Sequence, residues 1–195
     1  MRAADRVEKW SPAGCSDSGK TGPVVVPCSV DIAARSYSWR VTQVLRAGSR
    51  PSVSVDGPQT QLTQRSTPAL WGQLVARVFE MDAVVEGHSQ VSPPSSRAIF
   101  LTDVLIERAP ETSLAPGRRL EPVHLHGIHD TSLHLCLPAA RGAELTSAGW
   151  GEPHLYEDFG TEFMIYGPRD ESELDFIVSI VTESLDYARR PPLIS

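Results

Sequence analysis

Histidines dominate the part of the sequence that could do chemistry. Five of the six histidines lie between positions 124 and 154, and four of them fall within HLHGIHDTSLH: His124, His126, His129 and His134. Imidazole exchanges protons near neutral pH, and it is also a common metal ligand. A packed core does not require four imidazoles so close together, so we take this segment as the candidate functional centre.

The local pattern around these histidines predicts two short strands. Residues 123–126 and 131–137 alternate between apolar and polar side chains, and residues 127–130 could join them as an antiparallel pair. Alternate side chains of a strand point to opposite faces of a sheet. The polar residues expected on one face are His124, His126, Ser132, His134 and Cys136. The leucines between them would face the core.

Three roles remain open for this imidazole face. An HxH pair with a third imidazole is a spacing used by zinc and iron sites, but no CxxC or HExxH pattern accompanies it. General acid–base chemistry without a metal is the role we favour, with Asp130 or Glu152 orienting the base. The third role is structural, with imidazoles bonding to backbone groups. A Ser–His–Asp triad through Ser132 is disfavoured, because no GxSxG elbow is present.

Residues after this segment offer pocket walls and an anion clamp. Trp150 and Tyr166 could line an apolar pocket or pack in the core. Arg169 could hold a carboxylate or enolate oxygen, or it could cap a carbonyl at a turn.

One motif near the N-terminus is misleading. Residues 14–21, GCSDSGKT, satisfy the phosphate-loop pattern GxxxxGK[ST]. That loop needs a buried strand before it and a helix after it, so that backbone amides surround a phosphate. Pro12 and Pro23 flank this segment and disfavour both elements, so we expect no nucleotide site here.

Composition excludes several classes of partner. The formal net charge is -6 and no basic stripe is present, so we expect neither nucleic-acid binding nor a polybasic membrane anchor. No apolar run approaches the roughly 18 residues that span a membrane. The three cysteines lack CxxC spacing and indicate reduced thiols. We therefore expect a cytoplasmic protein with a small-molecule substrate; the sequence leaves the oligomeric state open.

The remaining pattern predicts a single α+β domain. Residues 1–40 are rich in Ser, Gly and Pro and are expected to form a poorly ordered tail, whereas residues 41–190 would form the domain. Three helices are predicted, over residues 68–79 behind the N-cap Thr67, residues 139–148 and residues 170–190. Two further strands are expected over residues 98–101 and 163–166. The fold would be a small antiparallel or mixed sheet with helices packed on one face.

Several ordered blocks of this sequence resemble the fungal luciferase family and its bacterial luciferase-domain relatives. The blocks are HLHGIHDTSLHL, GWGEPH, with Gly149, Trp150 and His154 in the matching positions, and YGPRDESEL, with Gly167 where the family has Ala. Upstream, RAGSRPSVS and TQL resemble family blocks that contain Arg50 and Gln61, in a segment that composition alone indicates to be a surface loop. The resemblance runs from about residue 46 to residue 187.

The resemblance implies an oxygen-dependent reaction. Fungal luciferase oxidises a hydroxylated α-pyrone, 3-hydroxyhispidin, through a cyclic peroxide that loses CO2, and the family is taken to need no metal or organic cofactor. We therefore expect molecular oxygen as co-substrate and no bound cofactor. Family luciferases carry an N-terminal membrane segment that this sequence lacks, and its composition looks bacterial, so the fold is expected to transfer more readily than the substrate.

The leading hypothesis is a cofactor-independent oxygenase-like enzyme of secondary metabolism that acts on a small enolisable pyrone, aromatic or polyketide-type molecule. The catalytic candidates are His124, His126, His129, Asp130 and His134. The substrate-binding candidates are Arg50, Gln61, Trp150, His154, Tyr166 and Arg169. Two alternatives stay open: an oxygen-independent cyclase, isomerase or decarboxylase, and a non-catalytic small-molecule binding domain.

Overall fold

The computed structural model describes residues 44–104, 109–155 and 158–190. The tail predicted over residues 1–40 and the phosphate-loop pattern at residues 14–21 lie outside the described residues.

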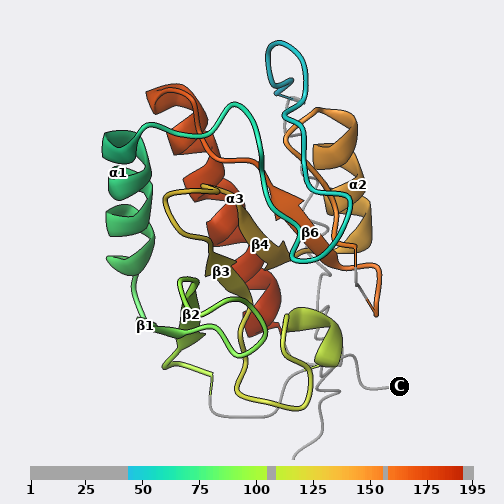
Figure 1. Ribbon diagram of the computed structural model, residues 1–195. Coiled ribbons are helices and arrows are strands. Elements are labelled where there is room, and N and C mark those ends of the chain that lie inside the picture. The colour runs from blue at the N-terminus through green and yellow to red at the C-terminus, as the bar shows by residue number, and fades with distance from the viewer. Residues whose placement is uncertain (1–43, 105–108, 156–157, 191–195) are drawn as a thin grey trace, which may run out of the picture. The chain divides into compact units, whose positions relative to one another are not determined.

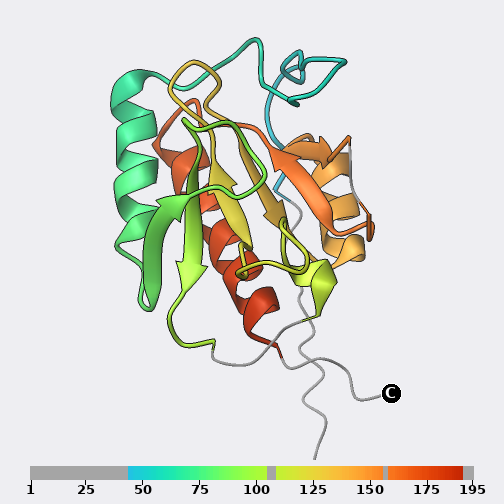
Figure 2. The ribbon, with the colours of Figure 1, turned by 60° about the horizontal axis from the view of Figure 1, so that its bottom comes forward.

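A six-stranded antiparallel sheet forms the centre of the fold (Figures 1 and 2), in the order β1-β2-β3-β4-β6-β5. Its strands are β1 (Val84–His88), β2 (Arg97–Leu101), β3 (Val123–Leu125), β4 (Leu133–Cys136), β5 (Gly151–Pro153) and β6 (Glu162–Ile165). The α+β class is confirmed, and the sheet is antiparallel rather than mixed.

Two helices cover one face of the sheet. The helix α3 (Glu171–Arg189) packs against β3, β4 and α1 (Pro68–Phe79), behind the strands in Figure 2. A third helix, α2 (Ala139–Ser147), packs beside β5. In the described part of the chain, none of these helices combines the length and apolar character that crossing a bilayer requires.

Local sequence signals determine where α1 and α3 begin. The side chain of Thr67 accepts a hydrogen bond from the backbone N–H of Leu70, and Pro68 occupies the first turn of α1. Asp170 Oδ1 accepts a bond from the backbone N–H of Glu173 at 2.9 Å at the start of α3. The N-cap predicted at Thr67 is confirmed, and Asp170 caps the helix that was predicted to begin there.

The core lies between the sheet and these two helices. Val123, Leu125, Leu133 and Leu135 are fully buried and belong to one apolar cluster with residues of α1 and α3. Because strand side chains alternate, the residues between these four must point to the opposite face. The apolar core therefore gives the histidines of β3 and β4 a rigid support.

Two strands were not predicted from the sequence. Residues 151–153 form β5 and pair with β6. The strand β1 reads VVEGH and lacks an alternating apolar pattern, because most of it is solvent-accessible. Both lie at the edges of the sheet, where pairing with one neighbour rather than burial defines the strand.

Candidate active site

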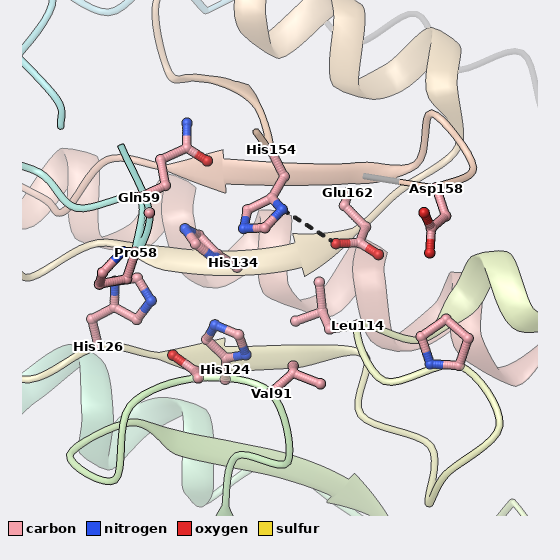
Figure 3. A pocket seen from close by; sticks show the side chains of 13 residues that line it. Pro58, Gln59, Val91, Leu114, His124, His126, His134, His154, Asp158 and Glu162 are labelled. Carbon is pink, nitrogen blue, oxygen red and sulfur yellow. Dashed lines mark ion pairs between the residues drawn. The ribbon is translucent and has the colours of Figure 1, made fainter. Parts of the chain in front are cut away.

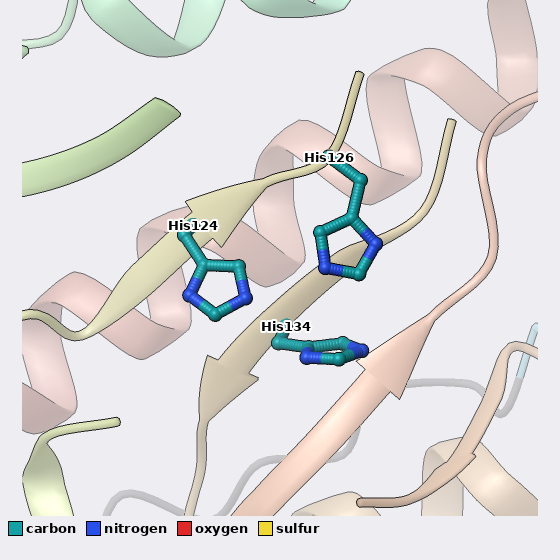
Figure 4. Close-up of side chains that lie close together, drawn as sticks. All are labelled: His124, His126 and His134. Carbon is teal, nitrogen blue, oxygen red and sulfur yellow. The ribbon is translucent and has the colours of Figure 1, made fainter. Parts of the chain in front are cut away.

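Three imidazoles converge on the face of the sheet opposite the helices (Figure 4). His124 of β3 lies directly opposite His134 of β4 in the strand register, and His126 follows β3 on the same face. The ring centroids are 4.5 Å apart for His126 and His134, 5.1 Å for His124 and His134, and 5.3 Å for His124 and His126. One nitrogen from each ring lies within 4.8 Å of the others. We call these three residues the histidine triad.

A buried carboxylate holds the first ring of the triad. Glu121 Oε1 lies 3.0 Å from His124 Nδ1, and Glu121 is completely buried. The same carboxylate accepts bonds from Ser89 Oγ at 2.6 Å and from the backbone N–H of Gln90 at 2.8 Å. Burial by itself would raise the pKa of Glu121, but these hydrogen bonds outweigh it and lower that pKa. Glu121 is therefore ionised at neutral pH.

A second carboxylate holds His126 in the same way. Asp130 Oδ2 contacts His126 Nδ1, while Asp130 Oδ1 accepts bonds from Ser132 Oγ at 2.7 Å and from the backbone N–H of Gln61 at 2.8 Å. Burial would raise the pKa of Asp130, but the hydrogen bonds from His126, Ser132 and Gln61 lower it. Thr131 follows with a φ of 62°, a left-handed conformation that is rare for a β-branched residue and that turns the chain into β4.

The carboxylates determine the tautomers of both rings. An ionised carboxylate only accepts hydrogen bonds, so Nδ1 of His124 and of His126 must donate. In a neutral ring, Nε2 then carries the free lone pair. The Nε2 atoms of His124 and His134 are buried and have no hydrogen-bond partner in residues 44–104, 109–155 and 158–190.

Burial keeps two rings of the triad, those of His124 and His134, uncharged. It is the largest cause that lowers the pKa of His124, and it lowers the pKa of His134 well below its usual range. Positive charge on the neighbouring imidazoles acts in the same direction, whereas a hydrogen bond with the backbone of Gln59 opposes the shift at His134. Both rings are therefore neutral near pH 7, and their Nε2 atoms can accept a proton or bind an electrophile.

The triad forms part of the wall of a pocket of about 520 Å³ (Figure 3). This volume is within the range of small-molecule sites. His154 follows β5 and places its ring 4.4 Å from that of His134. Burial, followed by the charges of His124 and His126, lowers the pKa of His154 to about 4. Its Nδ1, 3.5 Å from Glu162 Oε2, thus belongs to a neutral ring at pH 7.

Acidic and apolar side chains complete the pocket. Glu162 and Asp158 supply carboxylates, and Pro58, Val91 and Leu114 supply apolar surface. No lysine or arginine is among the described residues that line it. The pocket therefore favours a neutral or cationic occupant over a phosphorylated or otherwise anionic one.

Three of the predicted site residues lie away from this pocket. His129 is exposed in the loop after β3, where its backbone carbonyl accepts a hydrogen bond from Arg65. Arg50 is exposed and donates to the backbone carbonyl of Thr146. Arg169 is in contact with Glu173 at the start of α3 and donates to the backbone carbonyl of Ala47 at 2.8 Å.

Two predicted aromatic wall residues are buried elsewhere. Trp150 is 2% exposed, packs on Phe176 with ring centroids 4.3 Å apart, and donates through Nε1 to the backbone carbonyl of Val44 at 2.6 Å. Tyr166 donates to Glu152 Oε2 at 2.8 Å, and burial together with Glu152 raises the pKa of Tyr166 to about 12. Of the two roles open from the sequence, core packing is the one that the structure shows for Trp150.

Gln61 supports the site from behind. Its backbone N–H binds Asp130, and its side-chain Oε1 accepts a bond from the backbone N–H of Gly167 at 2.9 Å. A Cβ added at Gly167 would lie 2.0 Å from the backbone oxygen of Thr131, so glycine allows β6 and the β3–β4 loop to approach closely.

Sequence reasoning missed the carboxylates Glu121 and Glu162. Glu121 lies three residues before His124, so an acidic residue immediately upstream of the HxH pair was an available signal. No comparable signal marks Glu162. It reaches the pocket only because β6 pairs with β4, where Glu162 lies opposite Cys136.

The histidines and carboxylates of this site lie in a segment that matches a known family of proteins. A family model described as "Luciferase domain" matches residues 119–184, the segment that contains the histidine triad, both of its carboxylates, His154 and Glu162. Over these residues the chain is similar to luciferase domains. The resemblance to the fungal luciferase family is thereby confirmed.

Curated luciferases of fungi are similar to parts of this chain. A luciferase of Neonothopanus nambi is 28% identical over 170 residues, which is 79% of this chain and 64% of the relative. Luciferases of Armillaria gallica and Armillaria mellea are 40% identical over 78 residues, which is 37% of this chain and 29% of each relative. The chain thus spans less than two thirds of the length of these relatives. No solved structure matches it.

Proposed function

We propose that this chain is a luciferase-like oxygenase that acts on a small enolisable molecule of the pyrone, aromatic or polyketide type, with molecular oxygen as co-substrate. One observation carries the proposal: three imidazoles converge on a small-molecule pocket, and buried carboxylates orient two of them. The similarity to fungal luciferases supplies the reaction class.

His126 is the candidate base in this proposal. Asp130 accepts a hydrogen bond from Nδ1 of His126, and hydrogen bonds from Ser132 and Gln61 hold Asp130 in place. His126 Nε2 is therefore available to take a proton from the substrate. Asp130 also stabilises the imidazolium that forms. Removal of the proton from an enol leaves an electron-rich enolate, whose electron pair is then donated to O2.

The pocket is consistent with a neutral, compact substrate. Pro58, Val91 and Leu114 can pack on a flat ring, while the histidines and Glu162 provide hydrogen-bonding groups. The lack of a lysine or arginine among its described lining residues supports an uncharged substrate rather than a phosphate ester.

Oxygen uptake with a hydroxylated α-pyrone tests this proposal directly. The wild-type chain should consume O2 and release CO2 in equal amounts with such a substrate. His126→Gln should lower the rate by about 100-fold or more, the usual contribution of general base catalysis. His88→Ala is the matched control, because His88 is exposed at the end of β1 and does not line the pocket.

Other outcomes would assign a different function. Turnover under strict anaerobiosis would contradict the oxygenase proposal and indicate a cyclase, isomerase or decarboxylase that uses the same base. Recovery of unaltered pyrone from a tight complex would indicate a binding domain.

A further inference from the structure

We propose that the histidine triad is a metal site, in which Nε2 of His124, His126 and His134 bind one divalent first-row transition-metal ion. The sequence led to the expectation of a cofactor-free centre, and the geometry points the other way. This inference goes beyond the proposed function: it assigns His126 Nε2 to an ion, so it replaces the role of His126 as a free base and leaves the proposed reaction class unchanged.

The spacing of the three rings is close to that of a three-imidazole site. One nitrogen from each ring already lies within 4.8 Å of the other two. Nitrogens that share a tetrahedral ion, each at about 2.0–2.1 Å from it, are roughly 3.4 Å apart. Side-chain movements on the order of 1 Å would therefore bring all three onto one ion.

Two of these nitrogens lack a partner among the residues that the structure describes. His124 Nε2 and His134 Nε2 are both buried without a hydrogen bond, although the great majority of buried polar atoms in native proteins have one. The two rings face each other across β3 and β4, with centroids 5.1 Å apart (Figure 4). A single ion between them would satisfy both lone pairs at once.

The carboxylates behind the rings form the pattern that metal-bound histidines usually show. Glu121 binds Nδ1 of His124 and Asp130 binds Nδ1 of His126, so each leaves Nε2 as the ligand atom. Such outer carboxylates fix the tautomer, orient the ring and raise its basicity toward a metal. A general base needs one carboxylate–imidazole pair. Here two such pairs are directed at one point, and the two negative charges of Glu121 and Asp130 balance the charge of a divalent cation.

The charge of the pocket also favours a cation. Asp158 and Glu162 line it as well, and among the described lining residues there is no lysine or arginine to compete. Metal binding requires unprotonated imidazoles.

Three imidazole nitrogens as ligands limit which ions can bind, and they leave an open position in the coordination sphere of the ion. Imidazole suits zinc, iron, cobalt, nickel and copper, whereas calcium and magnesium prefer oxygen ligands. Three protein ligands leave at least one position for water or substrate. That position faces the pocket of about 520 Å³, where a substrate hydroxyl or enolate oxygen could occupy it.

Cobalt titration tests the site without any assay of activity. Protein treated with chelator and then desalted should bind one equivalent of Co2+, with visible absorption bands that report nitrogen coordination, and Zn2+ should displace the cobalt. His126→Phe and His134→Phe should each abolish the bands, since they keep an aromatic ring but remove the nitrogen. His88→Ala should titrate like the wild type, since His88 is exposed and lies outside the triad.

The two carboxylates provide a second, graded test. Glu121→Gln and Asp130→Asn should each weaken the affinity for Zn2+ by about 10- to 100-fold, as is usual for partners of ligand histidines. Circular dichroism identifies the variants that fold. If a phenylalanine variant does not fold, X-ray absorption of the cobalt-loaded wild type replaces it and should show three imidazole ligands.

The result decides the proposal in either direction. Failure of the wild type to take up cobalt or zinc, or unchanged binding in folded His126→Phe and His134→Phe, would overturn it. Oxygen uptake by wild-type protein that binds neither cobalt nor zinc would end the metal proposal and leave the proposed oxygenase standing. Stoichiometric metal without oxygen uptake would have the reverse meaning.

Discussion

Glu121 Oε1 lies 3.0 Å from Nδ1 of His124, and both side chains are almost completely buried. The contact decides where the imidazole proton lies: on Nδ1, facing the carboxylate, and not on Nε2, facing the pocket. Asp130, in the loop between β3 and β4, makes the same contact with Nδ1 of His126. The site is thus built from two carboxylate–imidazole pairs around a third imidazole.

Glu121→Gln should destabilise the fold by about 1–3 kcal/mol at pH 7. An amide cannot accept all the bonds that Glu121 receives from His124, Ser89 and Gln90, because its NH2 group would face one of these donors. Urea unfolding measures the loss. Glu144→Gln is the control: the Glu144 side chain is 62% exposed, and this change should stay within about 0.5 kcal/mol.

The same variant should show a defined pH dependence. The pKa of Glu121 is lowered in the folded protein, so its ionised form contributes stability above the unfolded value of 4.5. That contribution is lost as the pH falls through the folded pKa. The stability difference between wild type and Glu121→Gln should therefore shrink under acidic conditions, and an equal difference at low pH would contradict the assignment.

The buried imidazoles should make the fold acid-sensitive. His124, His134 and His154 have pKa values below 6.5 in the folded protein, so below pH 6.5 the unfolded chain binds protons that the folded chain does not. Each such ring costs about 1.4 kcal/mol per pH unit, so the free energy of unfolding should fall by up to about 4 kcal/mol between pH 7.5 and 5.5. For His154 the effect ends near its folded pKa of about 4.

Urea unfolding with chelator present measures this slope without competition from metal ions. His134→Phe should remove about a third of it, since one of three titrating rings is gone. Stability that does not change between pH 7.5 and 5.5 would show that these rings take up protons in the folded protein as they do in the unfolded chain, and would contradict the lowered pKa values.

The face that carries the site could be predicted because strand alternation is a local property. HLH and SLHLC place the imidazoles opposite the leucines in any extended conformation, and the β3–β4 pairing puts His124 against His134 as expected. The helix starts at Thr67 and Asp170 were equally predictable, because capping depends only on residues within one turn.

The composition of the pocket depends on contacts that are far apart in the sequence. Glu162 enters through the pairing of β6 with β4, and Gln61 reaches Asp130 across 69 positions of the chain. For Trp150 and Arg169 the sequence left two roles open. A family block marks them as conspicuous, but only the packing of α3 reveals that one lies in the core and the other is in contact with Glu173.

Two glycine substitutions should separate helix propensity from close packing. Alanine is favoured over glycine within a helix by about 1 kcal/mol. A Cβ at Gly142 in α2 would lie 2.0 Å from the ring of Phe163, however, so Gly142→Ala should destabilise the fold by about 1–3 kcal/mol. Gly72 in α1 has no atom within 4 Å of such a Cβ, and Gly72→Ala should stabilise by about 0.5–1 kcal/mol. Thermal unfolding of the two variants should shift in opposite directions.

Arg169 should matter for stability and not for the substrate, although the sequence predicted it to hold a substrate anion. Its guanidinium is in contact with Glu173 and donates to Ala47, and it does not line the pocket. Hydrogen bonds to charged groups contribute about 1.5–3 kcal/mol, so Arg169→Gln should lower the free energy of unfolding by roughly 2 kcal/mol. Measured on folded protein, the affinity for a pocket ligand such as a hydroxylated α-pyrone should not change.

His154→Gln should show the reverse pattern and weaken that affinity, because the ring of His154 lines the pocket beside His134. A loss of ligand affinity in Arg169→Gln at unchanged stability would return Arg169 to the binding site and contradict the boundaries of the pocket described above.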